Sequence, residues 1–290
     1  MKPAPFEYVV AESVDHAVAL KREHGDDARF LAGGQSLVPA MNFRLAQPRV
    51  LIDLNGIAGL DGVTEHDGGV RIGALTRHRT VERSATIAQR APLFAEAAPN
   101  VAHPQIRTRG TLGGNLAQAD PASEFPAVTL ALGARLHARS ASGSRQVEAG
   151  DFFTGVFATA LAPDEMLTAI DVPPLAPRTG TSFLEVARRR GDYAIVGAAA
   201  VVTLDDAGRC AGVRVALCGV ADRPVLLASP ARALRGERGT DASIRAAAAD
   251  VGAEIDPPAN VHATGAYRRH LACVLVQRAL ATAFARAHAA

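Results

Sequence analysis

Residues 29–39 read RFLAGGQSLVP, and this pattern predicts a buried strand, a glycine turn and the start of a helix. Adjacent glycines such as Gly33 and Gly34 permit positive φ angles and leave no Cβ, so a bulky anion can approach the backbone closely. Ser36 can cap a helix that begins at Leu37. Because free N–H groups at such a helix start favour phosphate oxygens, the stretch indicates a turn that can hold phosphate.

A second glycine pair lies in the stretch TLGGN, residues 111–115. This stretch is too rich in glycine for the interior of a helix or strand, so we expect another loop. The hydroxyl of Thr111 offers a neutral donor, as that of Ser36 does in the first loop. Each loop alone is most simply a tight turn, whereas two of them in one domain suit a pyrophosphate gripped from both sides.

Other phosphate and nucleophile motifs are missing from the sequence. There is no G-x-x-x-x-G-K-[ST], which argues against a nucleotide-hydrolysing P-loop. No G-x-G-x-x-G follows a strand, which argues against a Rossmann dinucleotide fold. The segment after Gly34 lacks the second glycine of a nucleophile elbow, so Ser36 is a poor hydrolase candidate. The nine histidines show no H-E-x-x-H spacing, and we expect no metal site.

The composition is that of an ordinary globular protein. Of 290 residues 48% are hydrophobic, and 31 basic against 29 acidic side chains leave a formal net charge of +2, so we expect no nucleic-acid partner. The longest apolar stretch, residues 193–204, is shorter than the roughly 20 residues of a membrane-spanning helix. Three cysteines without C-x-x-C spacing predict free thiols. With no apolar signal peptide at the N-terminus, we expect a cytoplasmic protein.

Before Pro173, the periodicity predicts short strands alternating with helices. Strands are expected at residues 6–10, 29–32, 50–54, 63–64, 70–72, 134–139, 146–147 and 166–172. Helices are expected after a Ser13 cap, after a Thr76 cap as far as residue 81, and over residues 91–101 and 124–132. The dipeptide at residues 67–68, Asp-Gly, is typical of a hairpin turn. Residues 103–104, His-Pro, predict an extended connection.

Proline and glycine cluster over residues 173–181, which predicts a boundary between two domains, residues 1–175 and residues 176–290. Beyond the boundary, strands are expected near residues 182–187, 198–204 and 213–218, and helices near residues 241–251 and 267–288. Strands followed by helices predict an α+β domain, with the helices on one face of an antiparallel sheet.

Taken together, the two glycine loops resemble those of one family, the FAD-binding medium subunits of molybdenum hydroxylases. This family includes the xanthine dehydrogenase and carbon monoxide dehydrogenase group. The resemblance extends over nearly the whole chain. The matching segments are residues 32–39 (AGGQSLVP), 52–54 (IDL), Arg107, 111–115 (TLGGN) and 189–194 (RRGDYA).

This resemblance implies an α+β protein. A vanillyl-alcohol-oxidase-type FAD-binding domain of two α/β parts would precede a smaller α+β domain with an antiparallel sheet and helices. FAD would lie extended between the two parts of the first domain. One side of the pyrophosphate would be wrapped by Ala32, Gly33, Gly34, Gln35 and Ser36. The other side would be met by Thr111, Gly113, Gly114 and Asn115.

Five more positions match family residues near FAD, and each has a plainer interpretation. Val101 would lie near the adenosine half or the ring edge. Glu124 would hold ribose or ribityl hydroxyls, or it is a first-turn carboxylate favoured by the helix dipole. Asp120 is a second such candidate, or it forms an Asx turn. Leu167 would touch the flavin through its backbone, or it belongs to the core. Tyr193 would sit beside the isoalloxazine, or it lies at a domain interface.

Two positions depart from the family pattern. Relatives often carry Lys near the position of Glu185, and a carboxylate there would disfavour an anionic reduced flavin through Coulomb repulsion. The redox tuning and the electron acceptor are therefore open. Gln35 replaces a His that some members have, but a neutral donor still serves phosphate.

By resemblance, the chain is an electron-transfer subunit. Substrate oxidation would occur at a molybdenum cofactor in a large subunit, and electrons would pass through [2Fe–2S] clusters of a small subunit to FAD here. An external acceptor, NAD, quinone or O₂, would take them from FAD, and the assembly would be a dimer of heterotrimers. Two such clusters need about eight Cys ligands, and this chain has three.

Two alternatives stay open. The chain could be a self-sufficient FAD-dependent oxidase or dehydrogenase of the same fold. That enzyme would need its own base or a covalent flavin link beside the ring, and the sequence offers no convincing His or Cys for either role. The chain could also be a scaffold that binds a nucleotide for assembly only.

Overall fold

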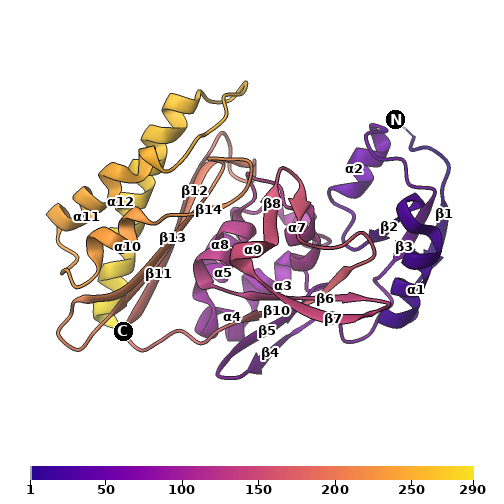
Figure 1. Ribbon diagram of the computed structural model, residues 1–290, viewed down its shortest axis with the longest axis horizontal. Coiled ribbons are helices and arrows are strands. Elements are labelled where there is room, and N and C mark those ends of the chain that lie inside the picture. Colours follow the sequence, from indigo (N-terminus) through magenta and orange to yellow (C-terminus); the bar gives the residue numbers. More distant parts are fainter. Residues whose placement is uncertain (1) are drawn as a thin grey trace.

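The computed structural model describes residues 2–290. Figure 1 shows three parts arranged in a row. A small parallel sheet with its helices forms one end, and an antiparallel sheet surrounded by short helices forms the middle. A second antiparallel sheet, covered by the long C-terminal helix, forms the other end. The mixture of helices and sheets confirms the α+β expectation.

The N-terminal part is a parallel α/β unit. Its strands β1 (Glu7–Val10), β3 (Val50–Asp53) and β2 (Ala28–Leu31) lie in the order β1-β3-β2, with helices α1 (Val14–His24), η1 (Gly25–Asp27) and α2 (Leu37–Asn42). Ser13 begins α1 as expected, because its hydroxyl accepts a hydrogen bond from the N–H of His16 at 3.1 Å. Gly25 ends that helix with a φ of 51°. Loops at the carboxyl ends of β2 and β3 therefore lie close together.

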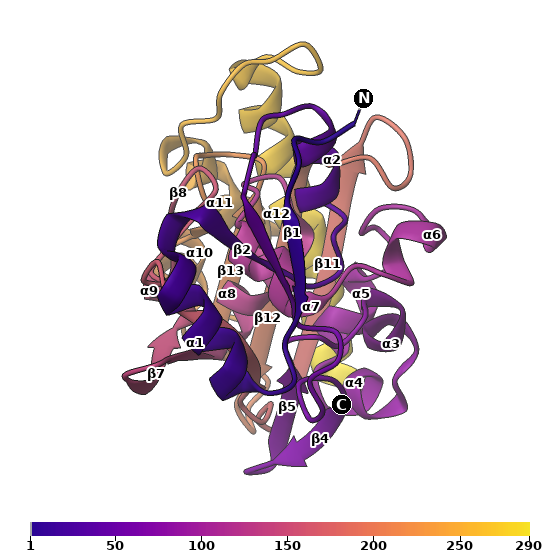
Figure 2. The ribbon, with the colours of Figure 1, turned by 90° about the vertical axis from the view of Figure 1, so that its right-hand side faces the viewer.

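The middle part is built on five antiparallel strands, and Figure 2 shows it behind the N-terminal part. Their order is β4 (Val63–His66), β5 (Gly69–Gly73), β10 (Met166–Val172), β6 (Arg135–Ser140) and β7 (Gly143–Glu148), and β8 (Phe153–Gly155) and β9 (Ala158–Thr159) form a separate pair. Its helices are α3 (His78–Arg83), α4 (Ala85–Arg90), α5 (Pro92–Ala97), α6 (Pro104–Arg107), α7 (Leu112–Gln118), α8 (Glu124–Leu132) and α9 (Ala149–Phe152). The expected hairpin turn is confirmed, because Asp67 and Gly68 have φ angles of 47° and 76°.

The C-terminal part is a four-stranded antiparallel sheet with helices. The strands are β11 (Thr179–Ala187), β12 (Ala194–Leu204), β13 (Cys210–Cys218) and β14 (Val225–Leu226), and the helices are α10 (Ser229–Leu234), α11 (Asp241–Ala249), η2 (Asp250–Ala253) and α12 (Gly265–Ala289). Helix α12 packs along β11 and β12, and α8 packs against β12 and β13.

Strand β12 is apolar along its length because both of its faces are covered. Ala198, Ala200 and Val202 belong to the core under α12. Ala199 and Val201 belong to the core of the middle part. A strand that is buried on both faces loses the alternation of apolar and polar residues. The longest apolar stretch of the sequence is therefore the seam between the middle and C-terminal parts.

Several local expectations were wrong. The second glycine pair lies inside α7 rather than in a loop. Thr76 does not cap α3; its hydroxyl instead bonds the N–H and the carbonyl of Gly62, both at 2.9 Å. His103 is extended as expected, but the connection ends there because Pro104 is the first residue of α6. Helix α5 ends at Ala97, earlier than expected, and α10 was not expected at all.

Among residues 2–290, none of the helices combines the length and the hydrophobicity that a bilayer crossing demands.

Candidate functional site

A cavity of about 1380 Å³ lies where the three parts meet. This volume is larger than the roughly 300–1,000 Å³ of a drug-sized ligand site, so it suits an extended ligand. Residues from the first glycine loop, from α7, from the start of α8 and from the segment before β12 share its wall. The fourteen residues singled out from the sequence all line it: Ala32, Gly33, Gly34, Gln35, Ser36, Val101, Thr111, Gly113, Gly114, Asn115, Asp120, Glu124, Leu167 and Tyr193.

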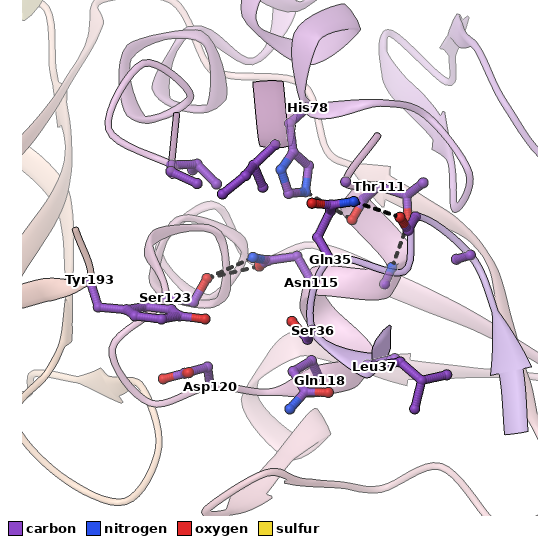
Figure 3. Close-up of a pocket in the computed structure, with 18 of the residues that line it drawn as sticks. Gln35, Ser36, Leu37, His78, Thr111, Asn115, Gln118, Asp120, Ser123 and Tyr193 are labelled. Carbon is purple, nitrogen blue, oxygen red and sulfur yellow. Dashed lines mark hydrogen bonds between the residues drawn. The ribbon is translucent and has the colours of Figure 1, made fainter. Parts of the chain in front are cut away.

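The first glycine loop presents free backbone donors. Within residues 2–290, the N–H groups from Gly33 to Ser36 donate to no protein acceptor. Gly34 has a φ of 72°, which side chains with a Cβ rarely adopt, and this angle turns the chain at the wall of the cavity. Ser36 occupies the N-cap position of α2, but its hydroxyl makes no capping bond, contrary to expectation. It points into the space shown in Figure 3 and can serve a ligand.

The second glycine pair does not present free backbone donors, which corrects the expectation of two equivalent loops. The N–H of Leu112 donates to the carbonyl of Thr76 at 2.9 Å, and that of Gly113 to the carbonyl of Ala74 at 2.8 Å. The N–H of Gly114 donates to the hydroxyl of Thr111 at 3.1 Å. On this side of the cavity, side chains rather than free backbone N–H groups are available to a ligand.

Gly33 and Gly113 each let a neighbouring segment approach the backbone closely. A Cβ on Gly33 would lie 2.3 Å from the carbonyl oxygen of Arg109. A Cβ on Gly113 would lie 2.5 Å from the Cβ of Ala74. Real Cβ atoms essentially never approach so closely. At these two positions the missing Cβ makes room for protein rather than for an anion, and the cavity keeps its shape because these contacts are tight.

Polar side chains on α7 and α8 form a fixed set of contacts. The amide of Asn115 and the hydroxyl of Ser123 exchange hydrogen bonds of 2.8 and 3.0 Å. Figure 3 shows this pair between Tyr193 on one side and Gln35 on the other. The side-chain amide of Gln35 donates to the carbonyl of Gly33 at 3.2 Å, which fixes the first loop.

His78 lines the cavity and was not singled out from the sequence. Its Nε2 lies 2.9 Å from the carbonyl of Thr111, and the ring packs edge-on against Phe125 at 5.2 Å. Burial lowers its pKa to about 4, so the ring is neutral and Nε2 donates its proton to that carbonyl. Its role is to support the second loop. The Arg-His-Arg triplet that contains it gave no signal of this.

Tyr193 and Asp120 lie at the opposite side of the cavity from the first loop (Figure 3). Tyr193 is 61% exposed, which leaves its ring free to meet a ligand. Burial of its hydroxyl, followed by the nearby charge of Asp120, raises its pKa to about 12. Asp120 also forms the Asx turn foreseen as its plainer role, because its carboxylate accepts from the N–H of Ala122 at 2.9 Å. Burial raises the pKa of Asp120.

Glu124 is the first residue of α8 and is only 3% exposed. Its carboxyl group lies near that of Glu185 of β11, whose Oε2 is buried without a hydrogen-bond partner. Burial raises the pKa of Glu124 to about 7, and burial together with the charge of Glu124 raises that of Glu185 to about 8. Near neutral pH the pair therefore carries less negative charge than two isolated carboxylates would. The expected full negative charge at Glu185 is thus reduced by a neighbour that no local pattern revealed.

We expect stability to fall as pH rises through the titration of this pair. Both pKa values lie above the ordinary value of 4.5, so the folded chain holds more protons than the unfolded chain between about pH 5 and about pH 8. Glu185→Gln removes one of the two charges. At about pH 8 it should raise the free energy of unfolding by about 1–3 kcal/mol, the usual cost of an unsatisfied buried group.

Chemical denaturation of the FAD-free chain across this pH range measures the effect. Glu23→Gln, on the exposed surface of α1, is the matched control. The wild type and the control should lose stability toward high pH more steeply than Glu185→Gln. Identical pH profiles for all three proteins would contradict the paired-carboxyl interpretation.

Leu167 and Val101 line the cavity and also belong to the core, with 6% and 5% exposure, so both of their alternative roles are compatible with the structure. Arg268 of α12 also reaches the cavity and is 4% exposed. It donates to the carbonyls of Ile195 and Gly219. Because those carbonyls come from distant segments, the sequence gave no hint of this residue.

Two family descriptions match the chain. "FAD binding domain in molybdopterin dehydrogenase" matches residues 4–175, and "CO dehydrogenase flavoprotein C-terminal domain" matches residues 181–283. The 6-hydroxypseudooxynicotine dehydrogenase complex subunit alpha of Paenarthrobacter nicotinovorans is 42% identical over 287 residues, which are 99% of this chain and 97% of the relative.

The carbon monoxide dehydrogenase medium chain of Hydrogenophaga pseudoflava is 38% identical, and the alignment covers 99% of each chain. A solved structure of carbon monoxide dehydrogenase from the same organism, which lacks the Mo-pyranopterin moiety of the molybdenum cofactor, matches with a TM-score of 0.96. That match covers 99% of each chain at 38% identity.

Proposed function

Because the chain belongs to the family of FAD-binding medium subunits of molybdenum hydroxylases, we propose that it passes electrons from the [2Fe–2S] clusters of a partner subunit through FAD to an external acceptor. The resemblance carried by the two glycine motifs is confirmed, as are its oxidoreductase class and FAD as its cofactor. The partner's clusters, the electron path and the acceptor are the proposed elements.

The cavity fits FAD in size and in chemistry. The observation that carries the assignment is the run of four free N–H groups from Gly33 to Ser36 on its wall. Backbone N–H groups without partners, next to a free hydroxyl, are donors for phosphate oxygens. We place the pyrophosphate against these donors. Bound there, FAD supplies the redox chemistry, and the protein supplies binding and orientation.

The remaining assignments follow from where the side chains lie. Thr111 and Asn115, with Gly113 and Gly114 between them, form the facing wall. Glu124 or Asp120 accepts hydrogen bonds from sugar or ribityl hydroxyls. Val101 and Leu167 give apolar contacts, and Tyr193 covers the isoalloxazine. Each of these is a proposal supported by the common cavity.

The paired carboxyls give this end of the site a limited negative charge. The raised pKa values of Glu124 and Glu185 mean that the pair carries less negative charge at neutral pH than two ionised carboxylates would. Of the two, Glu124 lines the cavity, so a ligand there would meet weaker repulsion from this pair.

The partners follow from the family. Relatives are named as subunits or medium chains of dehydrogenases, and the chain is one subunit of a multi-subunit complex. We propose that a molybdenum-cofactor large subunit and a [2Fe–2S] small subunit join it in a dimer of heterotrimers, with NAD, quinone or O₂ as acceptor. We also propose the division into residues 1–175 and 176–290. The three free cysteines suit the cytoplasm, which is the proposed location.

The purified chain should carry one FAD, bound without a covalent link. None of the three cysteines lines the cavity and the sequence offers no convincing His for a covalent link, so acid precipitation should release all flavin into the supernatant. Dithionite should bleach the visible absorbance of the bound flavin before precipitation. Flavin in the pellet would contradict the non-covalent assignment. A bound nucleotide that dithionite does not bleach would favour a scaffold that uses the nucleotide for assembly only.

A further inference from the structure

A chain of hydrogen bonds runs behind the cavity from the edge of the parallel sheet to the second glycine segment. It begins at Asp53, the last residue of β3, which is 8% exposed. The hydroxyl of Tyr8 donates to one carboxylate oxygen of Asp53. The backbone N–H and the side-chain amide of Asn55 donate to the other. Asn55 is thus fixed to the end of the central strand of the parallel sheet.

Asn55 then connects the first glycine loop with the segment before α3. Its side-chain N–H donates to the carbonyl of Ala32, the residue that opens the first glycine loop, at 2.9 Å. Its side-chain oxygen accepts from the guanidinium of Arg77 at 2.6 Å. A second nitrogen of Arg77 donates to the carbonyl of Arg109 at 2.5 Å. The forked guanidinium reaches both acceptors at once, which suits its fixed planar geometry.

The far end of this chain meets the first loop again. The carbonyl of Arg109 is the oxygen that a Cβ on Gly33 would approach to 2.3 Å. Arg77 also pairs with Thr111 in an isolated bridge between the strand-like segments before α3 and α7. The carbonyl oxygen of Arg109 therefore lies against the first loop and also accepts a hydrogen bond from Arg77, which Asn55 links to that loop. Neither Asn55 nor Arg77 lines the cavity itself.

We propose that Asn55 and Arg77 are positioning residues that form a clamp between the two glycine segments and set their spacing for FAD. The clamp joins the two parts of the FAD-binding domain at the point where they face the pyrophosphate site. This inference rests on the proposed placement of FAD between these segments. Without the clamp the two walls keep their residues but lose their fixed separation. Loss of preorganisation weakens binding although no contact to FAD is removed.

The test is the equilibrium dissociation constant of FAD, measured by titration of the FAD-free chain well below its melting temperature. Asn55→Ala and Arg77→Met should each raise this constant about tenfold or more. The dissociation constant of the double variant should not exceed the larger of the two single-variant constants, because each change opens the same clamp. Additive effects, or an unchanged constant in either single variant, would overturn the proposal.

A matched control separates positioning from general stabilisation. Arg139 donates to Asp15 at 2.8 Å and joins the same two parts of the domain away from the cavity. Arg139→Met should leave the dissociation constant of FAD unchanged. A melting curve of each FAD-free variant records any loss of stability separately. If Arg139→Met weakens FAD as much as Arg77→Met does, the effect is general and the clamp is refuted.

Arg77→Lys separates positioning from simple attraction of phosphate by charge. Lysine keeps the positive charge but cannot span two acceptors in the planar fork of arginine. The clamp predicts that Arg77→Lys weakens FAD nearly as much as Arg77→Met. Full affinity in Arg77→Lys would show that charge alone matters and would overturn the clamp. Gly33→Ala tests the placement of FAD separately. Full FAD affinity in Gly33→Ala would show that the placement is wrong, whereas lost affinity there with unchanged affinity in Asn55→Ala and Arg77→Met would refute the clamp alone.

Discussion

Gly33→Ala is expected to leave the chain folded and to lower its affinity for FAD by more than about 100-fold. The added Cβ would lie 2.3 Å from the carbonyl oxygen of Arg109, and backbone atoms lie on both sides of the contact. The first loop must move away from the second segment, which takes its free N–H groups out of register with the pyrophosphate. Overpacking of this kind costs about 1–3 kcal/mol. This is less than the usual stability of about 5–15 kcal/mol, so the fold should survive.

The ratio of flavin to protein after purification measures this effect, together with a circular-dichroism melt. Gly150→Ala is the matched control, because a Cβ on Gly150, in α9, meets nothing within 4 Å. The control should retain a full complement of FAD. A folded Gly33→Ala protein with one FAD per chain would contradict the assignment of the first loop to the pyrophosphate.

Local sequence signals predict a helix or strand correctly where capping residues and hydrophobic pattern alone determine it. The largely apolar run at residues 124–132 forms α8 with the expected bounds, and residues 166–172 form β10 with theirs. The helix that begins after Ser13 ends at Gly25, the stop signal that the sequence shows. In these cases capping, glycine and hydrophobic pattern all favour one structure.

Tertiary contacts decided the places where the expectations failed. The glycines of α7 are poor helix formers, yet the helix begins there because the N–H groups of Leu112 and Gly113 are held by carbonyls of the segment that follows β5. No local pattern shows that bond. The hydroxyl of Ser36 was expected to cap α2, but it is left free at the wall of the cavity.

The sequence motifs single out residues that share one cavity, but they do not predict the electrostatics of that cavity. Fourteen residues line one cavity because the two glycine segments and the start of α8 converge there. The pairing of Glu124 with Glu185 depends on the docking of the C-terminal sheet against α8, which brings together segments far apart in the sequence. The support given by His78 and Arg268 likewise depends on contacts to distant backbone carbonyls. Motifs indicate which residues gather at the cavity, whereas the ionisation of those residues depends on their burial and on their neighbours.

We expect the metal cofactors of the complex to be entirely absent from the isolated chain. The recombinant chain by itself should bind FAD but hold no iron–sulfur cluster and no molybdenum. Two [2Fe–2S] clusters need about eight cysteine ligands. Cys210 and Cys218 are buried, and Cys273 is half-buried. Within residues 2–290, no group of three or more His, Cys, Asp or Glu side chains could hold a metal ion.

Oxidation of the complex's organic substrate should therefore require the partner subunits. The metal-free chain should give no turnover of that substrate with artificial electron acceptors. Reconstitution with the partners should restore it. Robust turnover by the FAD-loaded, metal-free chain would favour the alternative of a self-sufficient FAD-dependent oxidase or dehydrogenase.

The composition of the native assembly decides whether this chain works as one subunit of a molybdenum hydroxylase. An affinity tag on this chain, expressed in its native source, allows the intact complex to be isolated and its polypeptides, flavin, iron and molybdenum to be quantified together. Our account predicts three different polypeptides in equal amounts, with one FAD for each copy of this chain and with iron and molybdenum present. Isolation of this chain alone, with flavin but no metal and with full oxidase or dehydrogenase activity, would contradict it.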